Sequence, residues 1–300
     1  MPLPDGLAHD HLTVDGGELH LLRAGTEGPL VVLVHGLDGS AANWVTVAAD
    51  LARDHRVVVP DLPGFGRTTL AGRRSSMTSF ADVVARVVEA EDAGPAVVAG
   101  NSMGGVVVTL AGARHPDLVS GVSLVAPAVP RAGGGRLDPS MLPALLALWT
   151  PGVGAATGLH RASQPPRERV DALLRLCVDP ANLGRLPDEA VEEMVVVAAA
   201  RTRDDQVRGW TSAARSLWAW LVRRGAYHDA ADAIRGPVQV LEGARDPIIP
   251  ASSIADTVAR HPTWEHVRME GVGHVPPLEA PADTAGALRR LVAAAHAARA

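Results

Sequence analysis

The sequence predicts an α/β fold: a mostly parallel central sheet flanked by helices, with a helical segment inserted after the sixth strand. Three observations indicate it. Short apolar runs alternate with stretches of helical spacing in both end regions of the chain. The connections between them are short, as they are between neighbouring elements of a wound sheet. Residues 130–232 interrupt this alternation with proline and glycine clusters and helical stretches, and contain no clear strand.

The N-terminal region begins with a hairpin signal and then alternates strand and helix. Residues 12–25 alternate apolar and polar side chains around Asp15-Gly16-Gly17, which is typical of a β-hairpin. Ser40 is the expected N-cap of the first helix, and Gly94 and Pro116 are expected to end the next two. We expect the strands at residues 29–36, 56–64, 95–100 and 119–128, and the helices at residues 40–55, 76–94 and 102–116.

The C-terminal region resumes the alternation after the insert. Strands are expected at residues 237–243 and 265–270, and helices at residues 252–261 and from residue 280 onward. Residues 1–129 and 233–300 are therefore predicted to form one core, and residues 130–232 a helical cap. Within the cap, helical spacing occurs at residues 143–149, 167–177 and 214–225.

Composition excludes several classes of partner. The chain has 28 basic and 33 acidic residues, a formal charge of −5, and no basic run, so we expect no nucleic acid or membrane surface as a partner. It shows neither a secretory signal nor an apolar run long enough to span a bilayer, so a soluble, cytoplasmic protein is expected. The single cysteine, Cys177, cannot form an intramolecular disulfide and is interpreted as a buried side chain.

Ser102 is the first candidate for chemistry, because it lies in Gly-Asn-Ser-Met-Gly between a predicted strand and a predicted helix. This context defines a nucleophile elbow, a sharp turn that raises the serine hydroxyl above the sheet. Side chains at Gly100 and Gly104 would collide with the neighbouring strand and helix. The bare pattern also fits a tight turn without chemistry, so the interpretation depends on partners elsewhere in the chain.

Two partners are available at the ends of later strands. Asp246 follows the strand at residues 237–243, and His274 lies in a glycine-rich loop after the strand at residues 265–270. Both loops are expected on the same sheet edge as Ser102, where sites of open α/β sheets gather. A serine needs a base, and the base an orienting carboxylate. The sequence has no HExxH motif or clustered Cys/His set, so we expect neither a metal nor a cofactor.

Five motifs in order resemble the α/β-hydrolase family of serine hydrolases, from about residue 10 to residue 295. These motifs are VHGLDGSAANW, DLPGFGRT with Thr68 at the usual serine position, GNSMGG, GARDPIIP and GVGHVPPLEAP. The resemblance implies that Ser102 is the nucleophile, His274 the base and Asp246 its orienting acid.

The resemblance also implies roles around this triad. The backbone N–H groups of Leu37 and Met103 would form the oxyanion hole. His35, followed by Gly36, would hold the loop and not act as a second base. Trp44 is expected in the core.

Several reactions use this framework. Haloalkane dehalogenases and epoxide hydrolases carry aspartate at the nucleophile position, so Ser102 argues against both. Hydrolases of ring-fission products, which cleave carbon–carbon bonds, share GNSMGG but usually have tryptophan where this chain has Val275. Thioester hydrolysis and acyl transfer use the same triad, and a ligand receptor with an intact triad is a non-enzymatic alternative.

Hydrolysis of carboxylic esters with small or medium apolar substrates is the favoured activity, because the insert is mostly apolar. Four tryptophans of the insert either line an acyl pocket or pack inside the cap: Trp149, Trp210, Trp218 and Trp220. The partner is thus expected to be a small-molecule substrate, and the sequence leaves the oligomeric state open.

Overall fold

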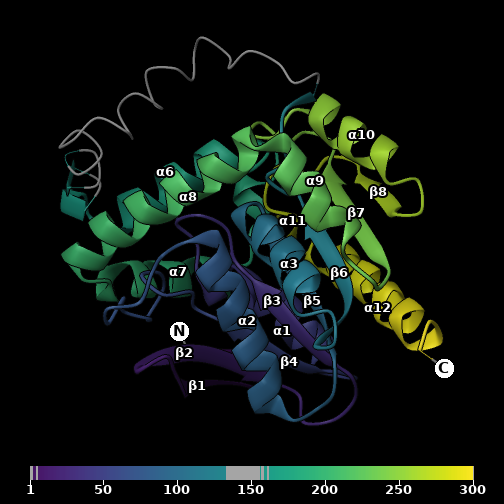
Figure 1. The fold of residues 1–300 in the computed structure, drawn as a ribbon. Coiled ribbons are helices and arrows are strands. Elements are labelled where there is room, and N and C mark those ends of the chain that lie inside the picture. The colour runs from purple at the N-terminus through teal and green to yellow at the C-terminus, as the bar shows by residue number, and fades with distance from the viewer. Residues whose placement is uncertain (1–2, 5, 133–155, 157–158, 161, 300) are drawn as a thin grey trace.

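The computed structural model describes residues 3–4, 6–132, 156, 159–160 and 162–299. One eight-stranded sheet runs through it in the order β1-β2-β4-β3-β5-β6-β7-β8 (Figure 1). The pairs β1–β2 and β2–β4 are antiparallel, and all other pairs are parallel, which confirms the mostly parallel sheet. The strands are β1 (Leu7–Val14), β2 (Gly17–Ala24), β3 (Leu30–Val34), β4 (Arg56–Pro60), β5 (Ala96–Asn101), β6 (Val119–Val125), β7 (Val238–Gly243) and β8 (Glu265–Met269).

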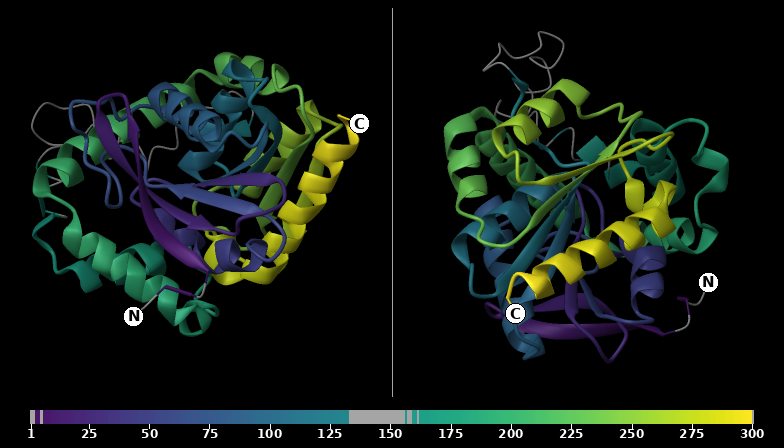
Figure 2. Two further views of the ribbon diagram at one scale, coloured as in Figure 1. Left: turned by 90° about the horizontal axis from the view of Figure 1, so that it is seen from below. Right: turned by 90° about the vertical axis from the view of Figure 1, so that its right-hand side faces the viewer.

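Helices cover both faces of the sheet, as Figure 2 shows in the view from below. One face carries α2 and α3, which pack on each other, and the other carries α1 and α12. The helices of the core are α1 (Val45–Leu51), α2 (Met77–Glu91), α3 (Met103–Arg114), α10 (Ala251–Arg260), α11 (Pro276–Glu279) and α12 (Pro281–Ala297).

Local sequence signals explain how these elements begin and end. The β1–β2 hairpin turns at Asp15 and Gly16, both with positive φ, as a two-residue hairpin loop requires. Ser40 caps the turn at residues 41–44 that leads into α1, and its hydroxyl accepts the Ala42 N–H. Helix α2 ends at Glu91, earlier than expected, because Asp92 adopts the left-handed conformation before Gly94 is reached.

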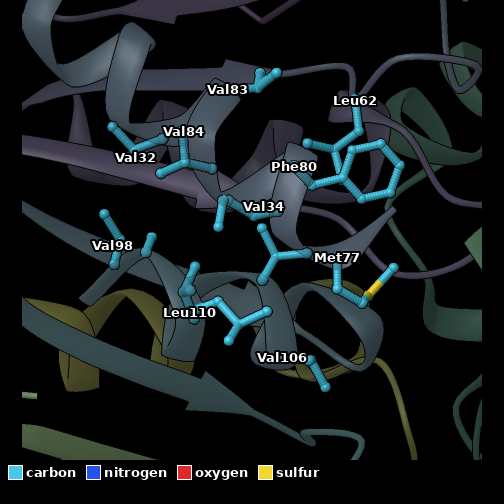
Figure 3. Close-up of a cluster of buried hydrophobic side chains, with 14 of the residues drawn as sticks. Val32, Val34, Leu62, Met77, Phe80, Val83, Val84, Val98, Val106 and Leu110 are labelled. Atoms are coloured by element: carbon cyan, nitrogen blue, oxygen red, sulfur yellow. The ribbon is translucent and has the colours of Figure 1, made fainter. Parts of the chain in front are cut away.

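The core has two apolar layers, one on each side of the sheet. Figure 3 shows the layer under α2 and α3, in which Val32, Val34 and Val98 of β3 and β5 lie in one buried cluster with side chains of both helices, among them Val84 and Leu110. On the other side Trp44, fully buried, packs among residues of α1 and α12, as expected. Burial on both faces explains why the parallel strands read as continuous apolar runs. Each large aliphatic side chain buried in this way contributes about 1.5–3 kcal/mol.

The described part of the insert between β6 and β7 consists of helices joined by loops and turns and contains no strand. It comprises α6 (Pro166–Cys177), α7 (Asp188–Ala200), α8 (Trp210–Val222) and α9 (Arg224–Asp232). Helices α6 and α7 share a small apolar cluster with Ala42, Val275 and Leu278 of the core. The expected helix at residues 143–149, with Trp149, lies outside the described residues. Among the described helices, none is both long and apolar enough to cross a membrane.

Candidate active site

Ser102 occupies a strained turn between β5 and α3. Its φ of 54° and ψ of −115° lie outside the regions that side-chain-bearing residues normally adopt. A Cβ at Gly100 would lie 2.1 Å from the Gly104 carbonyl oxygen, and one at Gly104 would lie 2.5 Å from the Val34 carbonyl oxygen. The turn therefore requires both glycines, as the sequence predicts, and it sets Ser102 at the start of α3.

The structure brings Ser102, His274 and Asp246 together within hydrogen-bond distance. His274 Nε2 lies 2.9 Å from Ser102 Oγ, and His274 Nδ1 lies 2.7 Å from Asp246 Oδ2. The side chains of His274 and Asp246 are only 6% and 5% exposed. Because Ser102 follows β5, Asp246 follows β7 and His274 follows β8, the three meet at the carboxyl edge of the sheet.

The orientation of Asp246 is fixed by its own loop. Its Oδ1 accepts hydrogen bonds from the backbone N–H groups of Ile248, at 2.7 Å, and Ile249, at 2.9 Å. Only Oδ2 is left to face His274. The carboxylate thus presents one defined oxygen to the imidazole Nδ1–H.

The backbone of His274 is held from two directions. Its N–H donates to the carbonyl oxygen of Cys177 at the end of α6, at 2.9 Å. Its carbonyl oxygen accepts from Asn101 Nδ2, at 3.0 Å. The Cys177 side chain itself is buried, as expected. The insert is therefore in direct contact with the loop of the candidate base.

Leu37 and Met103, the expected oxyanion donors, are both close to Ser102: Leu37 lines the same cavity as Ser102, and Met103 directly follows Ser102 in the chain. A Cβ at Gly36, next to Leu37, would lie 3.2 Å from Ser102 Cβ, and Met103 is the first residue of α3. The first N–H groups of a helix have no intrahelical acceptor. Within the described part of the chain, neither the Leu37 nor the Met103 N–H donates to a protein acceptor. Both groups thus lack a protein acceptor in the described part of the chain, as an oxyanion hole requires.

His35 uses both of its ring nitrogens within the protein. Nδ1–H donates to the Gly36 carbonyl oxygen at 2.7 Å, and Nε2 accepts the Leu62 N–H at 3.1 Å. Burial lowers the pKa of His35 below its usual 6.5, so the ring is held neutral. With no free nitrogen, it connects the loop after β3 to the loop after β4 and cannot act as a base.

The DLPGFGRT loop is organised around the buried carboxylate of Asp61. Its oxygens accept the N–H groups of Ala41 and Arg67, at 2.7 and 2.8 Å, and Oδ2 pairs with His20 Nδ1 at 2.8 Å. Thr68 Oγ1 accepts the backbone N–H of His20. The bonds of Asp61 connect the loop after β3 to β2. The Thr68 side chain binds the backbone of β2, so its contact is structural.

A cavity of about 560 Å³ opens beside Ser102 and His274. Its walls are mostly apolar, and Trp210 and Trp218 of the insert form part of them. Trp220 does not line this cavity and packs against the core, as Trp210 also does. Three apolar side chains that line the cavity are also exposed to solvent: Leu176, Val222 and Ile248. Of the three tryptophans in the described part of the insert, Trp210 and Trp218 thus contact the cavity.

Two residues that the sequence did not single out join the insert to the loops of the site. Arg201, at the end of α7, is 7% exposed; its Nη1 lies 3.1 Å from Asp38 Oδ1 and its Nη2 donates to the Gly64 carbonyl oxygen at 2.8 Å. Glu279 binds the His274 loop. The partners of Arg201 are far away in sequence, so no local pattern marks it. Glu279 lies within the GVGHVPPLEAP motif and binds nearby Gly273 and Val275, but its contacts with the insert are also far away in sequence. Among the described residues, no group of side chains suits a metal ion.

The comparisons with known proteins agree with this architecture. A family model described as alpha/beta hydrolase fold matches residues 29–281, so the chain belongs to the alpha/beta hydrolase fold family. The solved structure of a thermophilic esterase from Thermogutta terrifontis superposes with a TM-score of 0.70 at 23% identity, covering 97% of this chain and 99% of the esterase.

Two curated relatives are similar over most of this chain. The dihydrolipoyllysine-residue acetyltransferase component of the acetoin cleaving system of Pseudomonas putida is 30% identical over 280 residues, 92% of this chain. This chain spans 66% of that component's length, just under two thirds. The pimeloyl-[acyl-carrier protein] methyl ester esterase of Aromatoleum aromaticum is 28% identical, covering 86% of this chain and 95% of the esterase.

Proposed function

We propose that this protein is a serine hydrolase that cleaves carboxylic esters of small or medium apolar substrates through an acyl-enzyme on Ser102. The contact chain from Ser102 Oγ through the His274 imidazole to Asp246, at 2.9 and 2.7 Å, carries the proposal. A serine hydroxyl attacks a carbonyl only when a base takes its proton, and this arrangement supplies the base and its orienting acid. Residues 130–232 form the cap over the site in this proposal.

In the first half-reaction Ser102 Oγ attacks the ester carbonyl carbon, and its proton passes to His274 Nε2. Asp246 holds the Nδ1–H tautomer and stabilises the imidazolium that forms. The carbonyl oxygen becomes an oxyanion, which the N–H groups of Leu37 and Met103 bind; one such donor contributes about 3–4 kcal/mol to the transition state. The intermediate collapses, and the leaving alkoxide takes the proton from His274.

In the second half-reaction water replaces the alcohol. His274 takes a proton from the water as its oxygen attacks the acyl carbon, and the same N–H groups bind the new oxyanion. Collapse breaks the bond to Ser102 Oγ, which recovers its proton from His274. The carboxylic acid leaves and the enzyme returns to its starting state.

The cavity supports an apolar substrate of modest size. Its volume of about 560 Å³ lies in the range of small-molecule sites, and its walls include Leu173, Leu217 and Trp218. An apolar acyl chain placed there would lose its hydration without leaving a polar group unpaired, at a gain of about 0.8 kcal/mol per buried CH₂.

Acyl transfer or thioester hydrolysis is the second candidate. The observation that favours it is the 30% identity to a relative whose name is that of an acetyltransferase component. The same acyl-enzyme would then react with an acceptor other than water, or form from a thioester.

A fluorophosphonate probe and a series of p-nitrophenyl esters test the proposal. We expect the wild-type protein and a Ser252→Ala control, altered at an exposed serine of α10, to be labelled and to hydrolyse the esters. Ser102→Ala should lose both properties. Labelling without ester turnover would favour thioesters, acyl acceptors or carbon–carbon substrates, and absence of labelling would refute a serine hydrolase.

A further inference from the structure

The carboxylate of Glu279 collects four hydrogen bonds from two separate segments. Its oxygens accept the backbone N–H groups of Gly273, at 2.8 Å, and Val275, at 3.0 Å, which flank His274. They also accept the Asp179 N–H and the Asn182 Nδ2–H, both at 3.0 Å. Asp179 and Asn182 belong to the insert, immediately after α6. One side chain thus binds the His274 loop and the insert at once.

The two segments are in close contact at this junction. A Cβ at Gly273 would lie 2.6 Å from the Asp179 nitrogen and 2.9 Å from the Cys177 carbonyl oxygen. Asn182 Nδ2 also donates to the Gly271 carbonyl oxygen at 2.8 Å. The N–H groups at this junction need acceptors, because a buried donor without one is costly. The Glu279 carboxylate supplies a charged acceptor, and hydrogen bonds to charged groups are stronger than those to neutral groups.

We propose that Glu279 is a positioning residue, which fastens the insert to the His274 loop and thereby directs the imidazole toward Ser102 and Asp246. The inference rests on the proposed serine-hydrolase function. Glu279 is absent from the residues that line the cavity beside Ser102, so it acts through the backbone on both sides of His274. Because misplacement of a catalytic group by about 1 Å can cost about 100-fold in rate, fixing that backbone has a kinetic consequence.

Glu279→Gln tests the carboxylate with little change in shape. Oε2 accepts three of the four hydrogen bonds, and Oε1 accepts only that of Val275. In its better orientation the glutamine oxygen keeps the three bonds, and its NH₂ group faces the Val275 N–H. Two donors then oppose each other next to His274, so the loop must shift at that point.

The experiment compares wild type, Glu279→Gln and a matched control, Glu270→Gln. Glu270 lies directly before the same loop and its side chain is 82% exposed, bonded to Arg268 at 3.2 Å. We expect Glu279→Gln to lower kcat for a p-nitrophenyl ester about 10-fold. We expect KM to stay within about 3-fold, because the apolar side chains that line the cavity are unchanged and Glu279 is not among them. In proton NMR, the downfield signal of the His274 Nδ1–H should shift or broaden. The control should match wild type in all three.

Two outcomes overturn the inference. In one, folded Glu279→Gln keeps wild-type kcat and an unchanged Nδ1–H signal. In the other, the melting temperature of the variant falls while kcat and the Nδ1–H signal stay at their wild-type values, so that Glu279 only stabilises the fold. If wild type itself shows no turnover that depends on Ser102, the proposed function fails. The Nδ1–H signal then still decides whether Glu279 positions His274.

Discussion

Replacing Asp246 by asparagine should nearly abolish turnover while leaving the fold intact. The backbone N–H groups of Ile248 and Ile249 both point at one oxygen of Asp246, at 2.7 and 2.9 Å. In the variant they retain the amide oxygen, so the NH₂ group must face His274 Nδ1. That nitrogen then has to accept a hydrogen bond, and the proton moves to Nε2, where it faces Ser102.

The magnitude follows from this tautomer. An imidazole that carries its proton on Nε2 cannot take the proton of Ser102, so general-base catalysis is lost. The same change in a Ser-His-Asp triad costs about 10⁴ in kcat, which is about 5.5 kcal/mol. The residual rate would come from the oxyanion donors and substrate binding. Folding should change little, because the two backbone hydrogen bonds persist.

The assay is steady-state kinetics on the ester that wild type cleaves best, with melting curves for each variant. Asp54→Asn is the control, since Asp54 is half exposed and pairs with Arg289 on the surface. We expect the control to keep wild-type kcat. A folded Asp246→Asn variant with kcat within 10-fold of wild type would refute the tautomer argument.

Three further predictions concern stability and the loops around the site. Gly100→Ala should destabilise the fold by about 3 kcal/mol or more and abolish activity, because its Cβ would meet the Gly104 carbonyl oxygen at 2.1 Å. Arg201→Gln should lower the free energy of unfolding by about 2 kcal/mol and reduce kcat/KM, since the largely buried guanidinium no longer forms its ion pair with Asp38, which lies beside the expected oxyanion donor. Burial holds the pKa of His228 below its usual 6.5, so the folded state binds a proton there less readily than the unfolded state. The contribution of His228 to stability is therefore complete above pH 6.5 and is lost as the pH falls through the lower folded pKa. In urea unfolding between pH 7.5 and 5, His228→Gln should make the free energy of unfolding less dependent on pH.

Each of the three has a control of the same chemical kind. Gly286→Ala introduces a Cβ in α12 with no atom within 4 Å, so it should leave stability and activity unchanged or slightly raise stability. Arg208→Gln removes a guanidinium that is 72% exposed, and His296→Gln removes an exposed imidazole. A variant that behaves like its control contradicts the corresponding argument.

Much of the fold could be predicted from local patterns. The apolar runs at residues 29–36 and 95–100 locate β3 and β5, because strands covered on both faces need no polar side chains. The Asp15-Gly16 turn and the Ser40 cap also have local causes, since each depends on its own backbone and near neighbours. The end of α2 differed by a few residues because Asp92 took the left-handed conformation that the sequence assigned to Gly94.

Part of the candidate site could also be predicted from local patterns, and part could not. The requirement for Gly100 and Gly104 could be predicted from the sequence. A Cβ at Gly100 would meet an atom only four residues away, and a Cβ at Gly104 would meet the neighbouring strand β3. Ser102, Asp246 and His274 could be selected as candidates because each follows a predicted strand. Their hydrogen-bond distances could not be predicted, since they depend on how three separate loops meet.

The sequence by itself determined the order of the elements, the two-sided burial of the sheet and the strained turn at Ser102, all of which follow from periodicity and local sterics. Only the tertiary structure decided which oxygen of Asp246 faces His274, which tryptophans reach the cavity, and how Arg201 and Glu279 fasten the insert to the site. The physical reason is range. Periodicity records whether a position is buried, whereas a hydrogen bond across a hundred residues depends on the docking of whole segments, which no local pattern encodes.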